Sequence, residues 1–361
     1  MTDTVFLLGN IRAADWANIF LQDLARAFAN LGRDAVFLMC EDGPLEVEPA
    51  RLAAPGSFIV DINGKRDTGD YPKFSLVVDH PLAHPRLNHP GSRTVLGTVD
   101  AGHAVLGGIS PAPAVFVPHG GPAADADALT RRRDIDVLYV GNIPERFIPS
   151  APLEELALEA GRLVGHCCRD PFESLERALA GQGRSPWDFG REELRRLLAI
   201  ATDEAQRLAR TAAILGIRDC VFHVIGEIAD EVRARLPGNV VVHGFNRSFA
   251  ESRDLWRRSR LLINITQKFP RGSHERIWYG MASGTALVTN QSSFVAGDFT
   301  HGESILFYQD PRQVGELVAW ALEGDRAAAL AAAALPVYQA AHTWEERAER
   351  ILAAMSGLRR G

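Results

Sequence analysis

Residues 261–290 read LLINITQKFPRGSHERIWYGMASGTALVTN, and they indicate the fold class more clearly than the other segments of the chain. Its apolar run Leu261–Ile265 predicts a strand that is buried on both faces, because polar and apolar residues do not alternate in it. A polar loop with a glycine follows, then an expected helix near 274–283, then a second apolar run at Ala286–Thr289. A strand, a helix and another buried strand in this order predict a parallel sheet with helices on its faces.

Short apolar runs alternate with helical patterns along the rest of the chain in the same way. The further strands that we expect are Val5–Leu8, Ala35–Met39, Phe58–Asp61, Phe74–Val78, Thr94–Leu96, Val115–Val117, Ile135–Val140, Cys220–Ile225, Val240–Val242 and Ile305–Phe307. Helices are expected near 15–31, 227–235, 248–258, 311–322, 326–340 and 344–358. Strands that alternate with helices predict a doubly wound α/β architecture.

Chain length and one polar stretch predict two domains. A single core stops growing near roughly 250–300 residues, and this chain has 361. Small, polar and charged residues between 120 and 134 are typical of a linker. We therefore expect an N-terminal domain over 1–125 and a C-terminal domain over 134–340. The helical region 152–215 is too long for a simple crossover and predicts an insertion. Residues 341–361 predict a helix that packs across the domain junction.

The charge balance excludes a general nucleic-acid binder. The chain has 39 Lys and Arg residues against 45 Asp and Glu residues, so its formal net charge is −6. A nucleic-acid binder needs a basic field over its surface. A mildly acidic chain can still contain a local basic pocket for a phosphate group.

Cysteine content and hydropathy favour a cytoplasmic protein without a membrane segment. Cys40, Cys167, Cys168 and Cys220 are too few and too scattered for a disulfide framework or a zinc site with paired cysteines. Cysteine usage of this kind is typical of a reducing compartment. The first residues lack the basic segment and the cleavage site of a secretory signal. The chain also has no run of about 18 uncharged apolar residues that would span a membrane.

Polar and basic residues follow the first strand of the quoted stretch. In open α/β sheets, ligands bind beyond the carboxyl ends of the strands. Ser273 can cap a helix that begins near His274, and a helix N-terminus at this edge offers N–H groups and a positive dipole to a phosphate. A charge-assisted hydrogen bond from Lys268, Arg271 or Arg276 would add about 1.5–3 kcal/mol. These residues predict an anion site, and the alternative is a solvated loop followed by a surface helix.

Three motifs carry a family resemblance. S-x-E-R-x-x-Y-x-M-A-x-G-x-x-L-V-T spans Ser273–Thr289, GESILFYQD spans Gly302–Asp310, and HTWEERA spans His342–Ala348. These motifs resemble the nucleotide-sugar glycosyltransferases of the GT-B fold, most closely the CgeB-like, group-1-related family. The resemblance is good over 220–353 and looser over 1–125.

The resemblance implies two Rossmann-like domains that face a cleft, with an acceptor on the N-terminal domain and a nucleotide-diphosphate sugar on the C-terminal domain. It implies donor contacts along the anion loop from Lys268, Ser273, His274, Glu275 and Arg276. Turns after three strands extend this set, with Gly141 and Asn142, then Gly226, then Gly244 and Phe245. Glycine lets a backbone approach a ligand closely, and the third turn often lies against the nucleotide base in this family. A glycine after a strand is also ordinary loop chemistry, so each turn alone indicates little.

One departure from the family pattern concerns its carboxylates. Many retaining members carry two glutamates eight positions apart, the second just before the Met-Ala-x-Gly run. Arg271 and Tyr279 occupy these positions here, and Glu275 matches neither. We therefore assign no retaining glutamate pair, and the stereochemical course of transfer stays open.

Two places in the expected N-terminal domain carry candidate general bases. A base that takes the acceptor proton works best with a pKa near the operating pH, which suits Asp or His. Asp79 and His80 follow an expected strand and are our first candidates, with strand-end hydrogen bonding or a metal site with His84 as alternatives. Pro81 breaks any helix that would align the two histidines. Asp15, at the start of the first expected helix, is a second candidate, or it stabilises that helix through its dipole.

Together these features predict a metal-independent glycosyltransferase for a hexosyl or related sugar, with no cofactor beyond its nucleotide-sugar co-substrate. The helix N-terminus, Arg276 and Lys268 would stabilise the diphosphate leaving group, and such preorganised charge is usually the largest contribution to catalysis. A glycan, a protein or a small molecule would be the acceptor, and no nucleic-acid partner is expected. The alternatives are a nucleotide-sugar 2-epimerase and a degenerate GT-B domain that binds a glycan or a protein.

Overall fold

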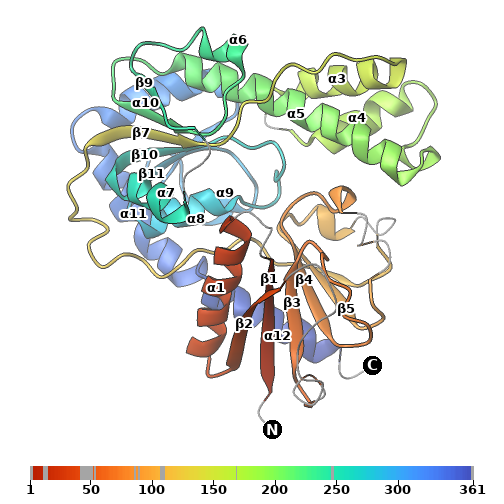
Figure 1. The fold of residues 1–361 in the computed structure, drawn as a ribbon. Coiled ribbons are helices and arrows are strands. Elements are labelled where there is room, and N and C mark those ends of the chain that lie inside the picture. The colour runs from red at the N-terminus through yellow and green to blue at the C-terminus, as the bar shows by residue number, and fades with distance from the viewer. Residues whose placement is uncertain are drawn as a thin grey trace. The chain divides into compact units, whose positions relative to one another are not determined.

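The computed structural model describes residues 3–10, 15–40, 52, 54–84, 87, 90–105, 110–167, 169–244 and 248–358. The chain forms two compact units (Figure 1). Unit 1 contains residues 1–123 and 341–361, and unit 2 contains residues 124–340. In the part of the chain that the structure describes, no helix is both long and apolar enough to cross a membrane.

Unit 1 is built on a parallel sheet of six strands in the order β2-β1-β3-β4-β5-β6. The strands are β1 (Thr4–Asn10), β2 (Asp34–Cys40), β3 (Phe58–Ile62), β4 (Lys73–Val77), β5 (Thr94–Thr98) and β6 (Ala114–Phe116). The helical elements include α1 (Asp15–Asn30), α12 (Trp344–Gly357) and the 3₁₀ turns η1 (Pro81–Ala83) and η3 (His103–Val105). Every residue of β3, β4 and β5 is buried, as expected of parallel strands that are covered on both faces.

The last helix, α12, is anchored in unit 1. It packs against α1 and β5, and the rings of Trp344 and Phe20 lie 6.0 Å apart between centroids. Arg347 is fully buried and donates to the backbone carbonyls of Pro118 and His119, each at 3.0 Å. The helix thus completes the core of unit 1, although residues 124–340 of unit 2 lie between it and the rest of unit 1 in the sequence.

Unit 2 is built on a second parallel sheet of six strands, in the order β12-β11-β10-β7-β8-β9. The strands are β7 (Ile135–Val140), β8 (Phe222–Ile225), β9 (Val240–Val242), β10 (Ser259–Asn264), β11 (Ala286–Asn290) and β12 (Leu306–Tyr308). The first strand, β7, lies in the middle, with β8 and β9 on one side and the later strands on the other. The strand order reverses between β7 and β10, and doubly wound sheets bind their ligands at such a reversal.

Helices cover both faces of this sheet, although not every helical element of unit 2 packs on it. The helical elements of unit 2 are α3 (Pro152–Val164), α4 (Pro171–Ala180), α5 (Arg191–Gly216), α6 (Asp230–Arg233), α7 (Phe249–Arg258), α8 (Glu275–Ala282), α9 (Val295–Asp298), α10 (Val314–Leu322), α11 (Arg326–Ala341) and the 3₁₀ turns η4 (Pro186–Asp188) and η5 (Pro311–Gln313). Neighbouring residues of a strand point to opposite faces. Ile263 and Val288 belong to a core cluster with α5, α10 and α11, whereas Gly280 of α8 packs on Leu262 and Leu287.

The expected strands are confirmed by β1–β12, with ends that differ by at most two residues. The helical region expected over 152–215 consists of α3, α4 and α5. In Figure 1, α3 and α4 lie beside α5 and away from the strands of unit 2. A glycine allows α3 to approach α5 closely, since a Cβ on Gly161 would lie 2.4 Å from the Ala201 carbonyl oxygen.

The polar stretch that we expected as a linker is anchored in unit 2 from residue 124 onward. Asp125 forms ion pairs with Arg131, Arg253 and Arg257. Burial raises the pKa of the Asp125 carboxyl, but the hydrogen bonds and charges of these arginines outweigh burial and lower it. Arg133 donates to five backbone carbonyls of unit 2. The charged residues of this stretch therefore hold it against the unit.

Candidate functional site

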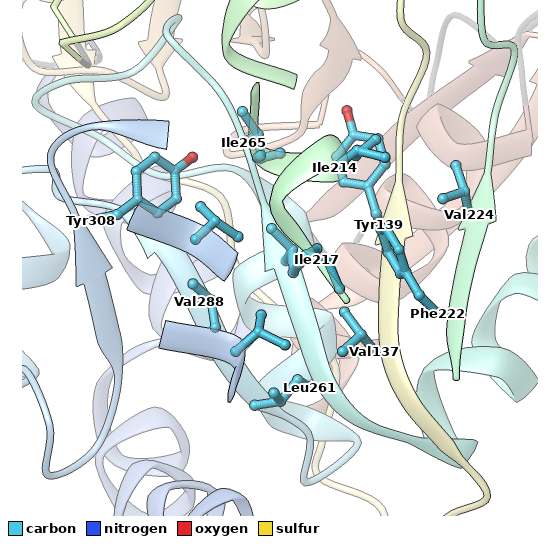
Figure 2. Packing of buried hydrophobic residues seen from close by; sticks show 14 of the residues in the cluster. Val137, Tyr139, Ile214, Ile217, Phe222, Val224, Leu261, Ile265, Val288 and Tyr308 are labelled. Carbon is cyan, nitrogen blue, oxygen red and sulfur yellow. The ribbon is translucent and has the colours of Figure 1, made fainter. Parts of the chain in front are cut away.

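The carboxyl ends of β7 and β10 form the edge at which the strand order of unit 2 reverses. Figure 2 shows the hydroxyl groups of Tyr139 on β7 and Tyr308 on β12 at the same end of the buried cluster as Ile265. The Tyr308 hydroxyl donates to the backbone carbonyl of Asn264 at 3.0 Å. Polar groups therefore lie directly on an apolar core at this edge, an arrangement common in ligand sites.

The turns after β7 and β8 bring Gly141, Asn142 and Gly226 together. The Gly141 N–H donates to the Ile225 carbonyl at 2.8 Å, and the Asn142 side-chain oxygen accepts from the Glu227 N–H at 2.9 Å. A Cβ on Gly226 would lie 2.2 Å from the Gly141 carbonyl oxygen, and its φ is +150°. Close packing of the two turns therefore requires these residues whether or not they also contact a ligand.

The third predicted turn follows β9, the edge strand of the sheet. Gly244 has a φ of +57°, a conformation that favours glycine. Among the described residues, no atom lies within 4 Å of a Cβ placed on it. Phe245, the other residue predicted here, lies outside the described residues. A donor contact from this turn stays a prediction.

Helix α8 begins at Glu275, and its N-cap residue is His274. The expectation that Ser273 caps this helix is wrong, because its hydroxyl accepts a hydrogen bond from the Trp278 indole N–H at 2.9 Å. His274 pairs with the Glu275 carboxylate, with Nδ1 and Oε2 2.5 Å apart. Within the described ranges, no side chain caps α8. Its first turn therefore offers backbone N–H groups, as an anion site requires.

Two predicted cations, Lys268 and Arg276, lie half-buried near the start of α8. The Nη1 atom of Arg276 is buried and has no hydrogen-bond partner among the residues that the structure describes. Arg271, the third basic residue of the predicted anion loop, lies elsewhere. It forms an ion pair with Glu173 of α4 at 2.6 Å, so the loop contributes two cations to this edge.

Arg210 of α5 adds a cation that was not among the predicted site residues. It is 8 % exposed, and its Nη1 donates to the Asn142 carbonyl. Burial lowers the pKa of its guanidinium, an effect that Tyr139 opposes and Arg276 strengthens. Burial also raises the pKa of the Tyr139 hydroxyl, which Arg210 and Arg276 oppose. These mutual effects place the two arginines and the tyrosine in one neighbourhood.

The sequence did contain a signal for Arg210. The neighbouring residues Ala209, Ala213 and Ile214 are all fully buried on α5. An arginine within an apolar helix face is uncommon, since arginine is rarely buried unless it is paired. Such a residue in the unassigned helical region 152–215 would have indicated a site.

Asp203 of α5 brings a negative charge close to two of these cations, Lys268 and Arg210. The residue is exposed, but partial desolvation raises the pKa of its carboxyl, and Lys268 and Arg210 oppose that rise. Gln267 is 2 % exposed, and neither polar atom of its amide has a hydrogen-bond partner in the described part of the chain. Positive charge therefore prevails at this edge, which suits a polyanion such as a diphosphate.

The position of the second glutamate of retaining relatives is part of the core in this chain. Tyr279 is 1 % exposed. Its ring centroid lies 5.6 Å from that of Phe249 and 5.8 Å from that of Trp256. Tyr279 therefore packs α8 against the aromatic rings of α7, and it adds no carboxylate to the site.

The predicted base Asp79 lies after β4, at the carboxyl edge of the unit 1 sheet. The Asn63 side chain accepts from the Val78 N–H at 2.9 Å and donates to the Asp79 carboxylate at 3.4 Å. The His84 Nε2 lies 3.5 Å from the same carboxylate oxygen. The Asp79 side chain remains 39 % exposed. Its carboxylate is therefore oriented by Asn63 and His84 and still reaches solvent at this edge.

His80, the other predicted base, supports the turn after β4. Its Nδ1 accepts from the Leu82 N–H at 3.3 Å and caps η1. Its ring packs edge-on against His103, with centroids 4.5 Å apart. Because this hydrogen bond uses a ring nitrogen of His80, Asp79 is better placed to accept a proton. No group of three or more His, Cys, Asp or Glu side chains within the described ranges could hold a metal ion.

Asp15, the second candidate base, is the first residue of α1. Its side chain and the loop 11–14 before it lie outside the described residues. The end of β1 is held by Asn18, which accepts from the Asn10 N–H at 2.9 Å and donates to the Asn10 carbonyl at 3.0 Å. A catalytic role for Asp15 stays a prediction.

Sequence comparison links the second half of the chain to a known family. Residues 191–353 match the model of a family described as glycosyl transferase-like. This range includes Arg210, Lys268 and Arg276. No curated protein matches the sequence significantly.

Solved structures with a similar fold cover nearly the whole chain. Sucrose-phosphate synthase from Thermosynechococcus elongatus has a TM-score of 0.55 and 12 % identity over 99 % of this chain and 99 % of that chain. The Anabaena protein Alr3699/HepE, solved with UDP and glucose, has a TM-score of 0.54 and 10 % identity over 98 % of this chain and 100 % of that chain. AviGT4, a glycosyltransferase involved in Avilamycin A biosynthesis, has a TM-score of 0.53 and 13 % identity over 98 % and 97 %. The chain therefore has the two-sheet α/β architecture of the GT-B fold, and its residues 191–353 match the glycosyl transferase-like family.

Proposed function

We propose that this protein transfers a sugar from a nucleotide-diphosphate donor on unit 2 to an acceptor on unit 1, without a metal ion. The observation that carries the proposal is the group of Lys268, Arg210 and Arg276 at the strand-order reversal. The fold shared with Alr3699/HepE, which was also solved with UDP-glucose, supports a donor of this class. Within this class we propose a CgeB-like, cytoplasmic enzyme for a hexosyl or related sugar.

The donor side would stabilise the leaving group. As the bond between the anomeric carbon and the diphosphate oxygen breaks, negative charge grows on the diphosphate. Arg276, Lys268 and the first N–H groups of α8 are placed to bind that charge, and hydrogen bonds between charged groups are the stronger ones. Fixed cations and a metal ion serve the same purpose at a phosphate group. The cations of this edge therefore support transfer without a metal.

The acceptor side would supply the base. Asp79 takes the proton of the acceptor hydroxyl while the acceptor oxygen bonds to the anomeric carbon. Asn63 and His84 hold the carboxylate in place, and His80 shapes the turn that presents it. Asp15 is the alternative base.

Thermal melting with nucleotides tests the donor site. The full chain is melted with UDP, GDP, dTDP, CMP and ADP, each with and without magnesium. A ligand at 100 times its dissociation constant adds about 2.7 kcal/mol, and each kcal/mol shifts the Tm of a domain of this size by about 2–4 °C. We therefore expect one nucleotide to raise the Tm by about 5–11 °C, equally in both conditions.

The other outcomes identify the alternatives. No shift with any nucleotide contradicts the proposal and indicates a module that binds a glycan or a protein. A shift that requires magnesium contradicts metal independence. Conversion of a nucleotide sugar in the absence of any acceptor indicates a 2-epimerase.

A further inference from the structure

Arg210 differs from two other arginines of little exposure because its hydrogen bonding is incomplete. Arg347 donates to three backbone carbonyls and pairs with Glu346. Arg133 donates to five backbone carbonyls. Arg210 donates to the Asn142 carbonyl, and its buried Nε has no partner among the described residues. Arg347 and Arg133 therefore bind several segments of the fold together, whereas the buried Nε–H of Arg210 makes no hydrogen bond with the described residues.

The groups around Arg210 leave its charge unbalanced. Asp203 attracts it, but the aspartate is an exposed residue. Arg276 adds a second positive charge nearby, which lowers the pKa of Arg210 further. A buried charge without a close partner destabilises a protein. A bound anion would compensate the charge of Arg210, which the protein's own carboxylates leave unbalanced.

Tyr139 offers a second buried donor in the same neighbourhood. Its side chain is 0 % exposed, and its hydroxyl has no hydrogen-bond partner in the part of the chain that the structure describes. A Cβ on Gly141 would lie 2.6 Å from that hydroxyl oxygen, so a residue with a side chain at this position would crowd the hydroxyl. Figure 2 shows the hydroxyl at the polar end of the core cluster.

The position of Arg210 is set by the packing of α5. Ala209 and Ala213 belong to the core cluster of unit 2. A Cβ on Gly315 of α10 would lie 2.3 Å from the Gly216 carbonyl oxygen, so the two helices touch through their backbones. Close packing of this kind leaves a helix little freedom to shift. A ligand that binds Arg210 therefore meets a preorganised group.

We infer that Arg210 and Tyr139 are the inner contacts for the donor diphosphate and make the site select nucleoside diphosphates over monophosphates. This inference rests on the proposed function. The Arg210 Nε–H and the Tyr139 O–H would donate to one phosphate group, while Arg276, Lys268 and the α8 N-terminus bind the other. The helical insertion, through α5, thus contributes a specificity-determining residue to the donor site.

The test compares Arg210→Met with Arg195→Met, a control on the same helix whose arginine pairs with Glu192 at the surface. Isothermal titration calorimetry on the full chain measures the affinity for UDP, GDP, dTDP and ADP and for their monophosphates. Loss of a charge-assisted hydrogen bond lowers affinity by about ten- to a hundredfold. We expect this loss in Arg210→Met for the diphosphate that the wild type binds and little change for its monophosphate. Arg195→Met should bind both like the wild type.

Melting without ligand separates this role from a structural one. An uncompensated buried charge destabilises a folded protein, and methionine replaces it by an apolar side chain, so Arg210→Met should melt at the wild-type Tm or above it. A lowered Tm with unchanged diphosphate affinity would show that Arg210 only supports the turn at Asn142. Tyr139→Phe, which removes one hydroxyl, should lower diphosphate affinity by about two- to tenfold and provides the test if Arg210→Met does not fold.

The outcomes distinguish this inference from the proposed function. A wild type that binds none of the nucleotides contradicts the proposed function itself. Diphosphate binding that survives in folded Arg210→Met and in Tyr139→Phe contradicts the inner contacts and leaves the donor site intact. Equal losses for diphosphate and monophosphate contradict the selectivity.

Discussion

Replacing Arg276 by alanine removes a half-buried guanidinium from the first turn of α8. Its Nη1 has no hydrogen-bond partner among the described residues, and its charge acts against Arg210. The variant therefore breaks little internal bonding and relieves a repulsion between like charges. We expect its unfolding free energy without ligand to stay within about 0.5 kcal/mol of the wild type.

The effect on nucleotide binding should be much larger. A charge-assisted hydrogen bond contributes about 1.5–3 kcal/mol, and each 1.4 kcal/mol is about a factor of ten in affinity. Affinity for the nucleoside diphosphate should therefore fall by at least about tenfold. At a ligand concentration of 100 times the wild-type dissociation constant, the stabilisation falls from about 2.7 to about 1.4 kcal/mol for a tenfold loss and to about 0.4 kcal/mol for a hundredfold loss.

Titration calorimetry and melting measure both quantities, and Arg271→Ala is the matched control. Arg271 lies in the same loop, but its guanidinium pairs with Glu173 of α4. An exposed ion pair of this kind contributes about 0–1 kcal/mol to stability, and its loss should leave nucleotide affinity unchanged. Wild-type affinity in folded Arg276→Ala, or an equal loss in Arg271→Ala, would refute the assignment of Arg276 to the donor phosphates.

Three further changes test other parts of the molecule. Asp79→Asn removes the proposed base and should slow transfer by about 10²–10⁴-fold without changing nucleotide-induced melting shifts; an unchanged rate would assign the base elsewhere. Gly226→Ala places a Cβ 2.2 Å from the Gly141 carbonyl oxygen, so urea unfolding should show a loss of about 1–3 kcal/mol, and wild-type stability would contradict the packing of the two turns. Burial, together with two nearby arginines, lowers the pKa of His342 to about 3. Between that pKa and about 6.5 the unfolded chain binds a proton that the folded chain excludes, so stability falls as the pH falls, by about 2 kcal/mol at pH 5. Urea unfolding at neutral pH and at pH 5 measures this loss, and a His342→Gln variant with the same pH dependence as the wild type would disprove it.

The strands were predictable because most of them are buried on both faces. A run such as Leu261–Ile265 does not alternate between polar and apolar residues, so hydropathy alone locates it, and β10 confirms it. The order of the strands was less accessible. β7 pairs with β10, with Ser259 opposite Ile135, and no local pattern indicates a partner so far along the chain.

The candidate site was predictable only in part. Lys268 and Arg276 follow a recognisable strand, so the edge rule for parallel sheets locates them. The cap expected from Ser273 was wrong because the Trp278 indole, one turn into the helix, takes its hydroxyl as a hydrogen-bond acceptor. Arg210 lies in α5, and the sequence of this helix does not indicate which end of the sheet Arg210 approaches.

The local sequence pattern was enough to locate the strands, the helices and the loops at the strand ends. Hydropathy, glycines and prolines act on residues close together in the chain, so their pattern can be read locally. The packing of distant segments set which polar groups come together, such as Arg210 with the Asn142 carbonyl in unit 2 and Asp79 with Asn63 in unit 1. These pairings arise where separate segments pack against one another, and packing between distant segments leaves no period in the sequence.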